Sequence, residues 1–378
     1  MRKTFKFRLN PVRHQRTLLD RTLELCRWVY NETLATRKKA WEQDQKSVSL
    51  YDTNKLLTGW KQEKPDLSQV HSQVLQNVQE RVDLAYQAFF RRVKAGENPG
   101  YPRFKGYGRY NSFTFKQSGF SLKDHGLLLS KIGLIKVIQH RPMEGKIKTL
   151  TLQRDGVGNW YACFSCEIEP KPLPPTDKVV GIDLGLTTFA VFSDGKEIKR
   201  QRWMKPDSKD VGRLQRKKEK LAKGSAERQK VVHALQHAYQ RQTNRRNNFA
   251  HQESRKLVNE YQFIAFEALD IQDMQSKGNK IINQGIADVA WGRFVQYTAY
   301  KAECAGRGVA LVDPKNTTQM CSGCGEIVAK DLNMRVHECP HCGLSLSRDR
   351  NAALNILARG LAGLDASPRS HAALAAVE

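Results

Sequence analysis

The sequence predicts a multidomain α+β protein: a β domain with a helical insertion, followed by an α/β domain with a cysteine-rich insertion. Three observations support this architecture. Apolar residues recur at helical spacing over 11–95, they alternate at strand spacing over 111–169, and beyond residue 178 short apolar runs alternate with helical segments. A length of 378 residues is enough for two or three domains with packed cores.

The chain is strongly basic, with 63 Lys and Arg residues against 38 Asp and Glu residues and a net charge of +25. A surface of this charge attracts polyanions because binding releases their counterions, so we expect a nucleic-acid partner. The positive charge is spread over the whole chain, which argues against a single amphipathic helix on a membrane surface.

No apolar run approaches the ~20 residues that a membrane span requires. The first residues, MRKTFKFRLN, alternate basic and apolar side chains, which is typical of a strand and not of a secretion signal. We therefore expect a cytoplasmic, nucleoid-associated protein whose eight cysteines are reduced.

The N-terminal part combines one strand with a helical bundle. Residues 3–9 form the strand. A first helix carries an apolar stripe with spacings of three and four, made of Leu19, Leu23, Cys26, Tyr30 and Leu34. A second helix carries a similar stripe, made of Val78, Val82, Ala85, Phe89 and Val93. If the strand joins the later sheet, this bundle is an insertion into a β domain.

The β domain follows the Gly- and Pro-rich stretch AGENPGYPRFKGYG. Beyond it the apolar period becomes two, most clearly at Trp160, Ala162, Phe164, Cys166 and Ile168. This predicts an antiparallel sheet or small barrel over 111–169. Cys163 and Cys166 should point to opposite faces of a strand, so they should not form a metal-binding pair. The segment KPLPPTDK is typical of a stiff linker.

After the linker, the predicted order is three strands and then alternating helix and strand. VVGIDLG and TTFAVF are the first two strands, and Asp194-Gly195 marks the hairpin to the third. A very basic helical region over 207–260 precedes the strand FIAFEAL, a helix around 287–305, the strand GVALVD, the cysteines and a helix in NAALNILARGL. This is the order of a ribonuclease-H-like domain.

Two CxxC pairs, CSGC and CPHC, are separated by fourteen residues and predict a structural zinc site. Each pair presents two thiolates to one tetrahedral ion, and four thiolates leave no open position for catalysis. The predicted ligands are Cys321, Cys324, Cys339 and Cys342. His337 and His341 are expected to be neighbours of the site and not ligands.

Three acidic residues end or begin elements that would bring them together. Asp183 follows the apolar run VVGI, Glu267 ends a second apolar strand, and Asp349 directly precedes a helix. Burying a carboxylate costs free energy unless it is paired or binds a metal ion, and carboxylate oxygens are ligands that suit Mg²⁺ or Mn²⁺. Phosphodiester hydrolysis at a two-metal site needs several carboxylates that converge from separate elements. The alternative for Asp349 is a helix N-cap.

GIDLG also resembles the first phosphate motif of actin-like ATPases and sugar kinases. That interpretation is disfavoured because the sequence lacks the second phosphate strand and the Gly-rich adenosine motif, and Asp155-Gly156 and Asp194-Gly195 both fit turns. An ATPase would also not need so large a positive charge.

The chain resembles TnpB, the OrfB-type protein of bacterial insertion sequences and a relative of type V CRISPR nucleases. The resemblance covers nearly the whole chain and rests on FRLNPVRHQ, LCRWVYN, GYPRFK, GIDLGL, FEALDIQDM, WGRF, NTTQMCSGCG, CPHCG and RDRNAALNIL. One departure is Ser347, where many relatives have an Asp; the following acidic position, Asp349, is kept.

The resemblance implies a wedge β-barrel domain (1–10 and 106–174), a helical recognition domain (11–105), a RuvC-like nuclease domain (175–315 and 346–360) and a zinc-ribbon insertion that binds target nucleic acid (316–345). The tail (361–378) is rich in Ala and Ser and is expected to be disordered. The resemblance assigns Asp183, Glu267 and Asp349 to the catalytic, magnesium-binding set. It also implies a guide RNA and a double-stranded DNA target, bound by one protein chain.

The nucleic-acid contacts are expected from basic, aromatic and amide side chains in the basic segments. The candidates are Lys3, Lys6, Arg8, Tyr51, Gln76, Arg103, Lys105, Arg213, Arg216, Lys217, Arg245 and Arg246. The segment YPRFKGYGRYNSFTF either stacks on unpaired nucleotides or forms a sheet core with a basic outer face.

The leading hypothesis is an RNA-guided DNA endonuclease that uses Mg²⁺ or Mn²⁺, with a target-adjacent motif and the guide RNA choosing the site. The alternatives are an RNA-guided repressor without nuclease activity and a transposase that joins strands without guide RNA. The complete acidic set favours a nuclease.

Overall fold

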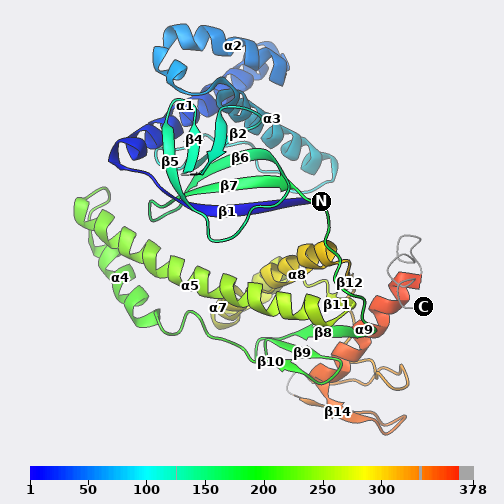
Figure 1. The fold of residues 1–378 in the computed structure, drawn as a ribbon. Helices are drawn as coiled ribbons and strands as arrows, with labels where there is room; N and C mark the ends of the chain where they lie inside the picture. The colour runs from blue at the N-terminus through cyan, green and yellow to red at the C-terminus, as the bar shows by residue number, and fades with distance from the viewer. Residues whose placement is uncertain (125, 332–333, 366–378) are drawn as a thin grey trace. The chain divides into compact units, whose positions relative to one another are not determined.

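A computed structural model describes residues 1–124, 126–331 and 334–365 (Figure 1). The chain divides into two compact units, Met1–Ile168 and Glu169–Glu378.

The first unit is built on a seven-stranded antiparallel sheet in the order β2-β6-β7-β1-β5-β4-β3. Its strands are β1 (Arg2–Asn10), β2 (Ser112–Phe115), β3 (Phe120–Lys123), β4 (Gly126–Leu129), β5 (Gly133–Ile138), β6 (Lys146–Arg154) and β7 (Trp160–Glu167). β1 pairs with both β7 and β5, so the helices that follow β1 in the chain are inserted between strands of one sheet. The order leaves β2 and β3 at its two edges, and closure into a barrel stays a prediction.

Alternation along the strands places the core on one face. In β1 the side chains of Phe5, Phe7 and Leu9 are buried while the residues between them are exposed. β7 alternates in the same way, with Cys166 buried and Cys163 on the less buried face. The prediction that these two cysteines diverge is confirmed.

Three α-helices follow β1: α1 (Arg13–Asp44), α2 (Leu50–Glu63) and α3 (Ser72–Lys94), with a short 3-10 helix η1 (Pro65–Gln69) between the last two. The predicted stripe of α1 is buried along its whole length. The stripe of α3 is buried only in its first half: Val78 and Val82 are buried, whereas Val93 is 49% exposed. The predicted helix is therefore confirmed, and the end of its apolar stripe is exposed.

The second unit contains a five-stranded sheet in the order β10-β9-β8-β11-β12. Its strands are β8 (Val179–Leu184), β9 (Ala190–Phe192), β10 (Glu197–Ile198), β11 (Phe263–Glu267) and β12 (Gly308–Val312). The first three form an antiparallel meander, and β11 and β12 are added parallel to β8. This is the strand sequence predicted for a ribonuclease-H-like domain.

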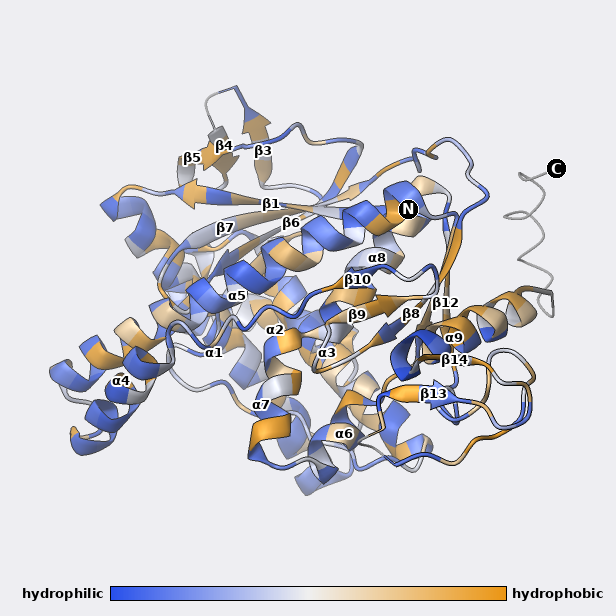
Figure 2. Ribbon diagram, turned by 90° about the horizontal axis from the view of Figure 1, so that it is seen from below, coloured by the Kyte–Doolittle hydropathy of each residue, from blue (hydrophilic) through white to orange (hydrophobic). Residues whose placement is uncertain are grey.

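The helices of this unit are α4 (Ser208–Lys220), α5 (Ala226–Glu260), α6 (Ile271–Lys277), α7 (Lys280–Val289), α8 (Trp291–Ala305) and α9 (Arg348–Asp365). Helices cover both faces of the sheet, whereas α4 packs against α5 and has no buried residue. The single basic helical region predicted over 207–260 is therefore two helices. The residues of α5 are largely hydrophilic (Figure 2), and Ala250, Leu257 and Val258 near its end belong to the core on the sheet.

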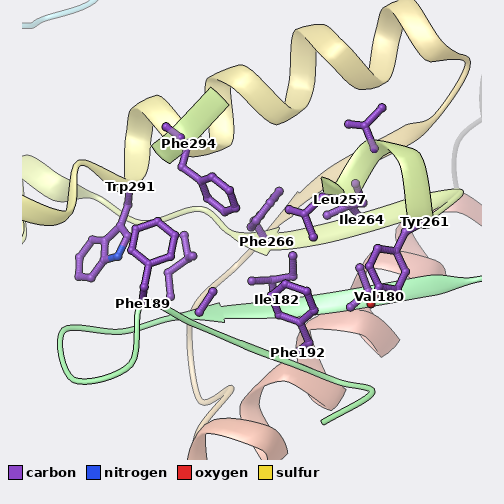
Figure 3. Packing of buried hydrophobic residues seen from close by; sticks show 14 of the residues in the cluster. Val180, Ile182, Phe189, Phe192, Leu257, Tyr261, Ile264, Phe266, Trp291 and Phe294 are labelled. Atoms are coloured by element: carbon purple, nitrogen blue, oxygen red, sulfur yellow. The ribbon is translucent and has the colours of Figure 1, made fainter. Parts of the chain in front are cut away.

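One face of the sheet packs against α5 and α8 through a cluster of aromatic and aliphatic side chains (Figure 3). Phe294 of α8 lies edge-on to Phe189, with ring centroids 5.1 Å apart, and to Phe266 of β11, at 5.9 Å. Such edge-to-face pairs contribute about 0.5–1.5 kcal/mol beyond their buried area. This core fixes the strand ends that carry the acidic residues.

The opposite face packs against α9 at unusually short range. A side chain at Gly181 of β8 would lie 2.1 Å from the carbonyl oxygen of Ala353, and one at Gly360 would lie 2.7 Å from Ala265 of β11. Glycine at both positions therefore lets α9 lie directly on the two central strands. As a result, the start of α9 is held against the end of β8.

The C-terminal boundary differs from the prediction. The tail was expected to begin at residue 361, but α9 continues to Asp365, because Leu361 and Leu364 pack against the sheet. Residues 366–378 of the predicted tail lie outside the described residues. Within the described residues, none of the helices combines the length and apolarity that a bilayer crossing needs.

We predict that Gly181→Ala destabilises the second unit by about 1–3 kcal/mol, because the added methyl group forces α9 away from β8. Gly363→Ala on the same helix is the matched control: a side chain there meets no atom within 4 Å, so its effect should be neutral or slightly stabilising. Thermal unfolding of both variants measures the difference. Equal melting temperatures would contradict this account of the packing.

Candidate metal sites

Three carboxylates converge at one edge of the five-stranded sheet. Asp183 is the fifth residue of β8 and Glu267 the last of β11, and Ile182 lies directly opposite Phe266 in this parallel pair. Both acids therefore follow paired residues at the carboxyl ends of neighbouring strands. Asp349 is the second residue of α9, which packs on these strands.

The N-cap of α9 is Ser347 and not Asp349. The Ser347 hydroxyl accepts a hydrogen bond from the backbone N–H of Arg350 at 3.2 Å, the usual capping contact. The alternative role for Asp349 as a cap is therefore wrong, and its carboxylate instead lies 3.3 Å from Nε of Arg348. The serine that departs from the related sequences starts the helix.

The electrostatics show that Asp183 senses both of the other carboxylates. Burial, followed by the negative charges of Glu267 and Asp349, raises the pKa of Asp183 from 3.8 to about 7, against the opposing charge of Arg348. Burial also raises the pKa of Glu267, which is only 8% exposed. A bound cation would stabilise the ionised form of these carboxylates.

The three carboxylates are less tightly grouped than the cysteines: among the described residues, the cysteine cluster is the group of three or more candidate ligands whose ligand atoms all lie within 4.8 Å of one another. Paired catalytic ions lie about 3.5–4 Å apart, and each can take different carboxylates. The oxygen-only donor set fits Mg²⁺ or Mn²⁺.

Sequence reasoning missed Thr317. Its hydroxyl donates a hydrogen bond to Oε1 of Glu267, and its side chain is 2% exposed. This residue belongs to NTTQMCSGCG, the segment between β12 and the first cysteine pair. Nothing in its local pattern indicates this contact, because it joins residues 50 positions apart.

The four predicted cysteines form one cluster. The sulfur atoms of Cys321 and Cys342 lie 3.6 Å apart, as do those of Cys324 and Cys339, and all four lie within 4.8 Å of one another. A tetrahedral ion with Zn–S bonds of about 2.3 Å requires sulfur atoms roughly 3.8 Å apart. The cluster therefore fits zinc without rearrangement.

Both cysteine pairs sit in turns of the same design. The N–H groups of Gly325 and Gly343 donate to the carbonyl oxygens of Cys321 and Cys339, each at 2.9 Å, and both glycines have a positive φ, 83° and 74°. Only glycine adopts this backbone easily. The second turn joins the hairpin of β13 (Val336–Glu338) and β14 (Ser345–Ser347), which leads into α9.

The two histidines are neighbours of the cluster and not members of it, as predicted. His337 is fully buried, and its Nδ1 atom contacts the ammonium group of Lys330. Lys330 also donates to the carbonyl oxygen of Thr318 at 3.1 Å. This pair therefore helps to pack the loop around the thiolates.

In the first unit, most of the predicted nucleic-acid contacts are on the surface. The ammonium group of Lys6 lies 4.2 Å above the ring of Tyr161, and Arg8 donates to Asn159 at 2.7 Å. Tyr51 is 68% exposed. The remaining candidates are exposed or half-buried: Lys3, Gln76, Arg103 and Lys105. Nothing here tests whether they bind nucleic acid, so they stay predictions.

In the second unit, the candidates fall into two groups. Arg213, Arg216 and Lys217 are exposed on α4. Arg245 instead forms an ion pair with Asp207 at 3.0 Å, and Arg246 donates to the carbonyl oxygen of Ala287 at 2.6 Å. These two are half-buried, whereas the three on α4 are exposed, and Arg213 is also paired, with Asp210 at 3.1 Å. Phosphate binding by any of the five stays a prediction.

The aromatic segment YPRFKGYGRYNSFTF contains both exposed aromatic residues and aromatic residues of the sheet core. Its first part is exposed, with Tyr101, Phe104 and Tyr107 at 44%, 53% and 85%. Its second part contributes Phe113 and Phe115 to the core of the sheet. Stacking on unpaired bases is therefore open only to the first part.

Family comparisons divide the chain into three matches. The OrfB_IS605 family, described as "Probable transposase", matches residues 163–277. A Cas12f1-like TNB domain matches residues 291–356, which include the cysteine cluster and Asp349. A helix-turn-helix domain of the OrfB_IS605 type matches residues 1–46, where the structure has β1 and the single helix α1.

Whole-chain relatives point the same way. A candidate RNA-guided DNA endonuclease of Streptomyces pristinaespiralis is 33% identical over 96% of this chain and 90% of its own length. Its counterpart InsQ of Escherichia coli is 29% identical over 96% and 93%. The CRISPR-associated endodeoxyribonuclease Cas12f1 of Sulfoacidibacillus thermotolerans is 27% identical over 59% of this chain and 56% of its own length.

Among solved structures, CasPhi-2 (Cas12j) bound to crRNA overlaps 96% of this chain and 98% of its own with a TM-score of 0.47 and 10% identity. On the strength of its full-length relatives, the chain belongs to the TnpB family of IS605-type insertion sequences.

Proposed function

We propose that the protein is an RNA-guided DNA endonuclease that cuts double-stranded DNA by metal-dependent phosphodiester hydrolysis. The observation that carries this proposal is the convergence of three carboxylates, where burial and then the charges of Glu267 and Asp349 raise the pKa of Asp183. Full-length relatives named as RNA-guided DNA endonucleases support the same conclusion.

Asp183, Glu267 and Asp349 would hold Mg²⁺ or Mn²⁺. Ions bound there would supply an activated water and the charge that stabilises the leaving oxygen. The residues themselves bind and orient: β8 and β11 fix two carboxylates, and α9 delivers the third. Arg348 lies beside Asp349, with Nε 3.3 Å from its carboxylate, and limits the negative charge of the site.

Binding of nucleic acid and of zinc is proposed from the positive charge and the cysteine cluster. The basic surfaces would bind a transposon-derived guide RNA and the target duplex, with a target-adjacent motif read by the protein. The first unit would contain the wedge and recognition domains, and zinc in the cysteine cluster would be structural. The working form would be one protein chain with one guide RNA.

A transposase acting without guide RNA is the less favoured function. The description "Probable transposase" belongs to a family match over 163–277 only, whereas the relatives that align over nearly the full chain are named as endonucleases. Strand-transfer products formed without added RNA would favour the transposase. A complex that binds DNA but never cuts it would favour a repressor.

Isosteric substitution of each carboxylate should abolish cutting. Each of three variants removes one ligand charge: Asp183→Asn, Glu267→Gln and Asp349→Asn. We expect the rate of plasmid cleavage to fall at least about 1,000-fold, which corresponds to about 4 kcal/mol less stabilisation of the transition state. Guide-RNA binding should be unchanged. The matched control is Asp270→Asn, three residues after Glu267, whose side chain caps α6. Full cleavage by one of the three variants would remove that residue from the site.

The raised pKa of Asp183 predicts a pH-dependent stability. Because its pKa rises from 3.8 to about 7 on folding, the folded protein binds more protons than the unfolded chain, and stability falls as pH increases between these values. Asp183→Asn should therefore stabilise zinc-loaded, magnesium-free protein at pH 8 by roughly 1–3 kcal/mol, but have little effect near pH 4. Thermal unfolding at both pH values measures this. An identical effect at both would contradict it.

The cysteine cluster should hold one zinc ion per chain. Cys324→Ser combined with Cys342→Ser removes two thiolates, so metal analysis of the purified protein should show loss of zinc together with a lower melting temperature. Cys163→Ser, in β7 and outside the cluster, is the control and should keep its zinc. Purified wild-type protein that contains no zinc would overturn the assignment.

A further inference from the structure

Three polar side chains spaced four residues apart lie on one face of α9. Asn351, Asn355 and Arg359 all donate hydrogen bonds to the connecting segment 313–322, which leads from β12 to the first cysteine pair. The acceptors are backbone carbonyl oxygens: Met320 for Asn351 at 2.7 Å, Thr317 and Met320 for Asn355 at 2.8 and 2.7 Å, and Asp313 and Lys315 for Arg359 at 2.8 and 2.7 Å.

The two amides are buried, so losing their hydrogen bonds would destabilise the folded protein. Asn351 is fully buried and Asn355 is 2% exposed, beside apolar neighbours such as Ile356. A buried amide without a partner costs about 1–3 kcal/mol, so these side chains are tolerated only while the connecting segment stays in place. Helix and segment therefore hold each other in register.

The same contacts reach the zinc cluster. The side-chain oxygen of Asn351 accepts a hydrogen bond from the backbone N–H of Ser322 at 2.9 Å. Ser322 directly follows Cys321 in the first cysteine turn. Asn351 thus joins the cysteine turn to the helix that also carries Asp349, two residues away.

At the centre of the connecting segment, the backbone turns so that Thr317 faces Glu267. Asn316 adopts a left-handed φ of 61°, a conformation that asparagine tolerates better than most residues. The hydroxyl of Thr317 has one proton and two acceptors in reach, Oε1 of Glu267 and the carbonyl oxygen of Pro314 at 3.1 Å. A carboxylate is the stronger acceptor, so the proton goes to Glu267.

We propose that Thr317 is a positioning residue that orients the Glu267 carboxylate for metal binding, and that Asn351 and Asn355 hold Thr317 there. The hydroxyl engages Oε1, which leaves Oε2 for an ion and stops the carboxylate from rotating. Partners of this kind typically change metal affinity or activity 10- to 100-fold. The inference rests on the proposed nuclease function and gives the zinc-bearing turn a second role, as part of the frame of the acidic site.

The test compares Thr317→Val, which keeps the shape and loses the hydroxyl, with Thr317→Ser, which keeps the hydroxyl. We expect Val to raise the half-saturating Mg²⁺ concentration for cleavage about 10- to 100-fold and Ser to stay within about threefold of wild type. Mn²⁺ binding to the zinc-loaded protein without nucleic acid, followed by electron paramagnetic resonance, should weaken in the same order. Zinc content and guide-RNA affinity should stay constant.

A second variant tests the link through α9. Asn355→Leu removes the amide but leaves the Thr317 hydroxyl in place, so a shift in Mg²⁺ dependence toward that of Thr317→Val is expected. Ala358→Ser, on an exposed position of the same helix, should behave like wild type. If Asn355→Leu fails to fold, the Thr317 pair still decides.

The outcomes separate this inference from the function on which it rests. If Glu267→Gln cuts like wild type, the nuclease assignment of that carboxylate fails. If Glu267→Gln is inactive but Thr317→Val has the Mg²⁺ dependence and Mn²⁺ affinity of wild type, only the positioning role is overturned. Equal losses in the Val and Ser variants would also overturn it, because they would show that the hydroxyl is not the active feature.

Discussion

A buried carboxylate beside two others is the constraint on which the acidic edge of the second unit depends. In the absence of a cation, burial of Asp183, followed by the charges of Glu267 and Asp349, raises its pKa to about 7. Coulomb energy and desolvation both oppose this arrangement. The surrounding fold therefore has to be rigid where these side chains are attached, and most of its local features supply that rigidity.

Three kinds of contact resist the repulsion. Parallel pairing of β8 and β11 fixes the register of two strand ends. Glycines at 181 and 360 allow α9 to lie directly on those strands, which brings the third carboxylate to the same edge. Buried amides on α9 then tie down the segment that carries Thr317. One helix thus presents a ligand, packs against the sheet and holds the connection to the cysteine cluster.

The cysteine cluster and the acidic site are parts of one local structure. The chain passes from β12 through the connecting segment into the first cysteine turn, returns through β14 and enters α9. Any metal that orders the cysteine turns also orders the residues before and after them. This explains physically why an insertion without catalytic groups lies between the second and third carboxylates.

Periodicity and spacing predicted much of this from sequence, and long-range contact explains what they missed. The strand order, the cysteine cluster and the divergence of Cys163 and Cys166 follow from alternation and spacing, which are local properties. Partners distant in sequence are not local: Thr317 meets Glu267 across 50 positions, and Arg245 meets Asp207 across 38. The end of α3 shows the converse, since Val93 fits an apolar stripe but is 49% exposed.

The most direct test is to locate divalent ions at the acidic edge. Crystals of the protein soaked in Mn²⁺ and measured at the manganese absorption edge should show anomalous peaks within about 2.3 Å of carboxylate oxygens from Asp183, Glu267 and Asp349. Peaks shared among all three residues are the predicted result. Manganese bound elsewhere, or these carboxylates left without an ion at saturating Mn²⁺, would contradict the account.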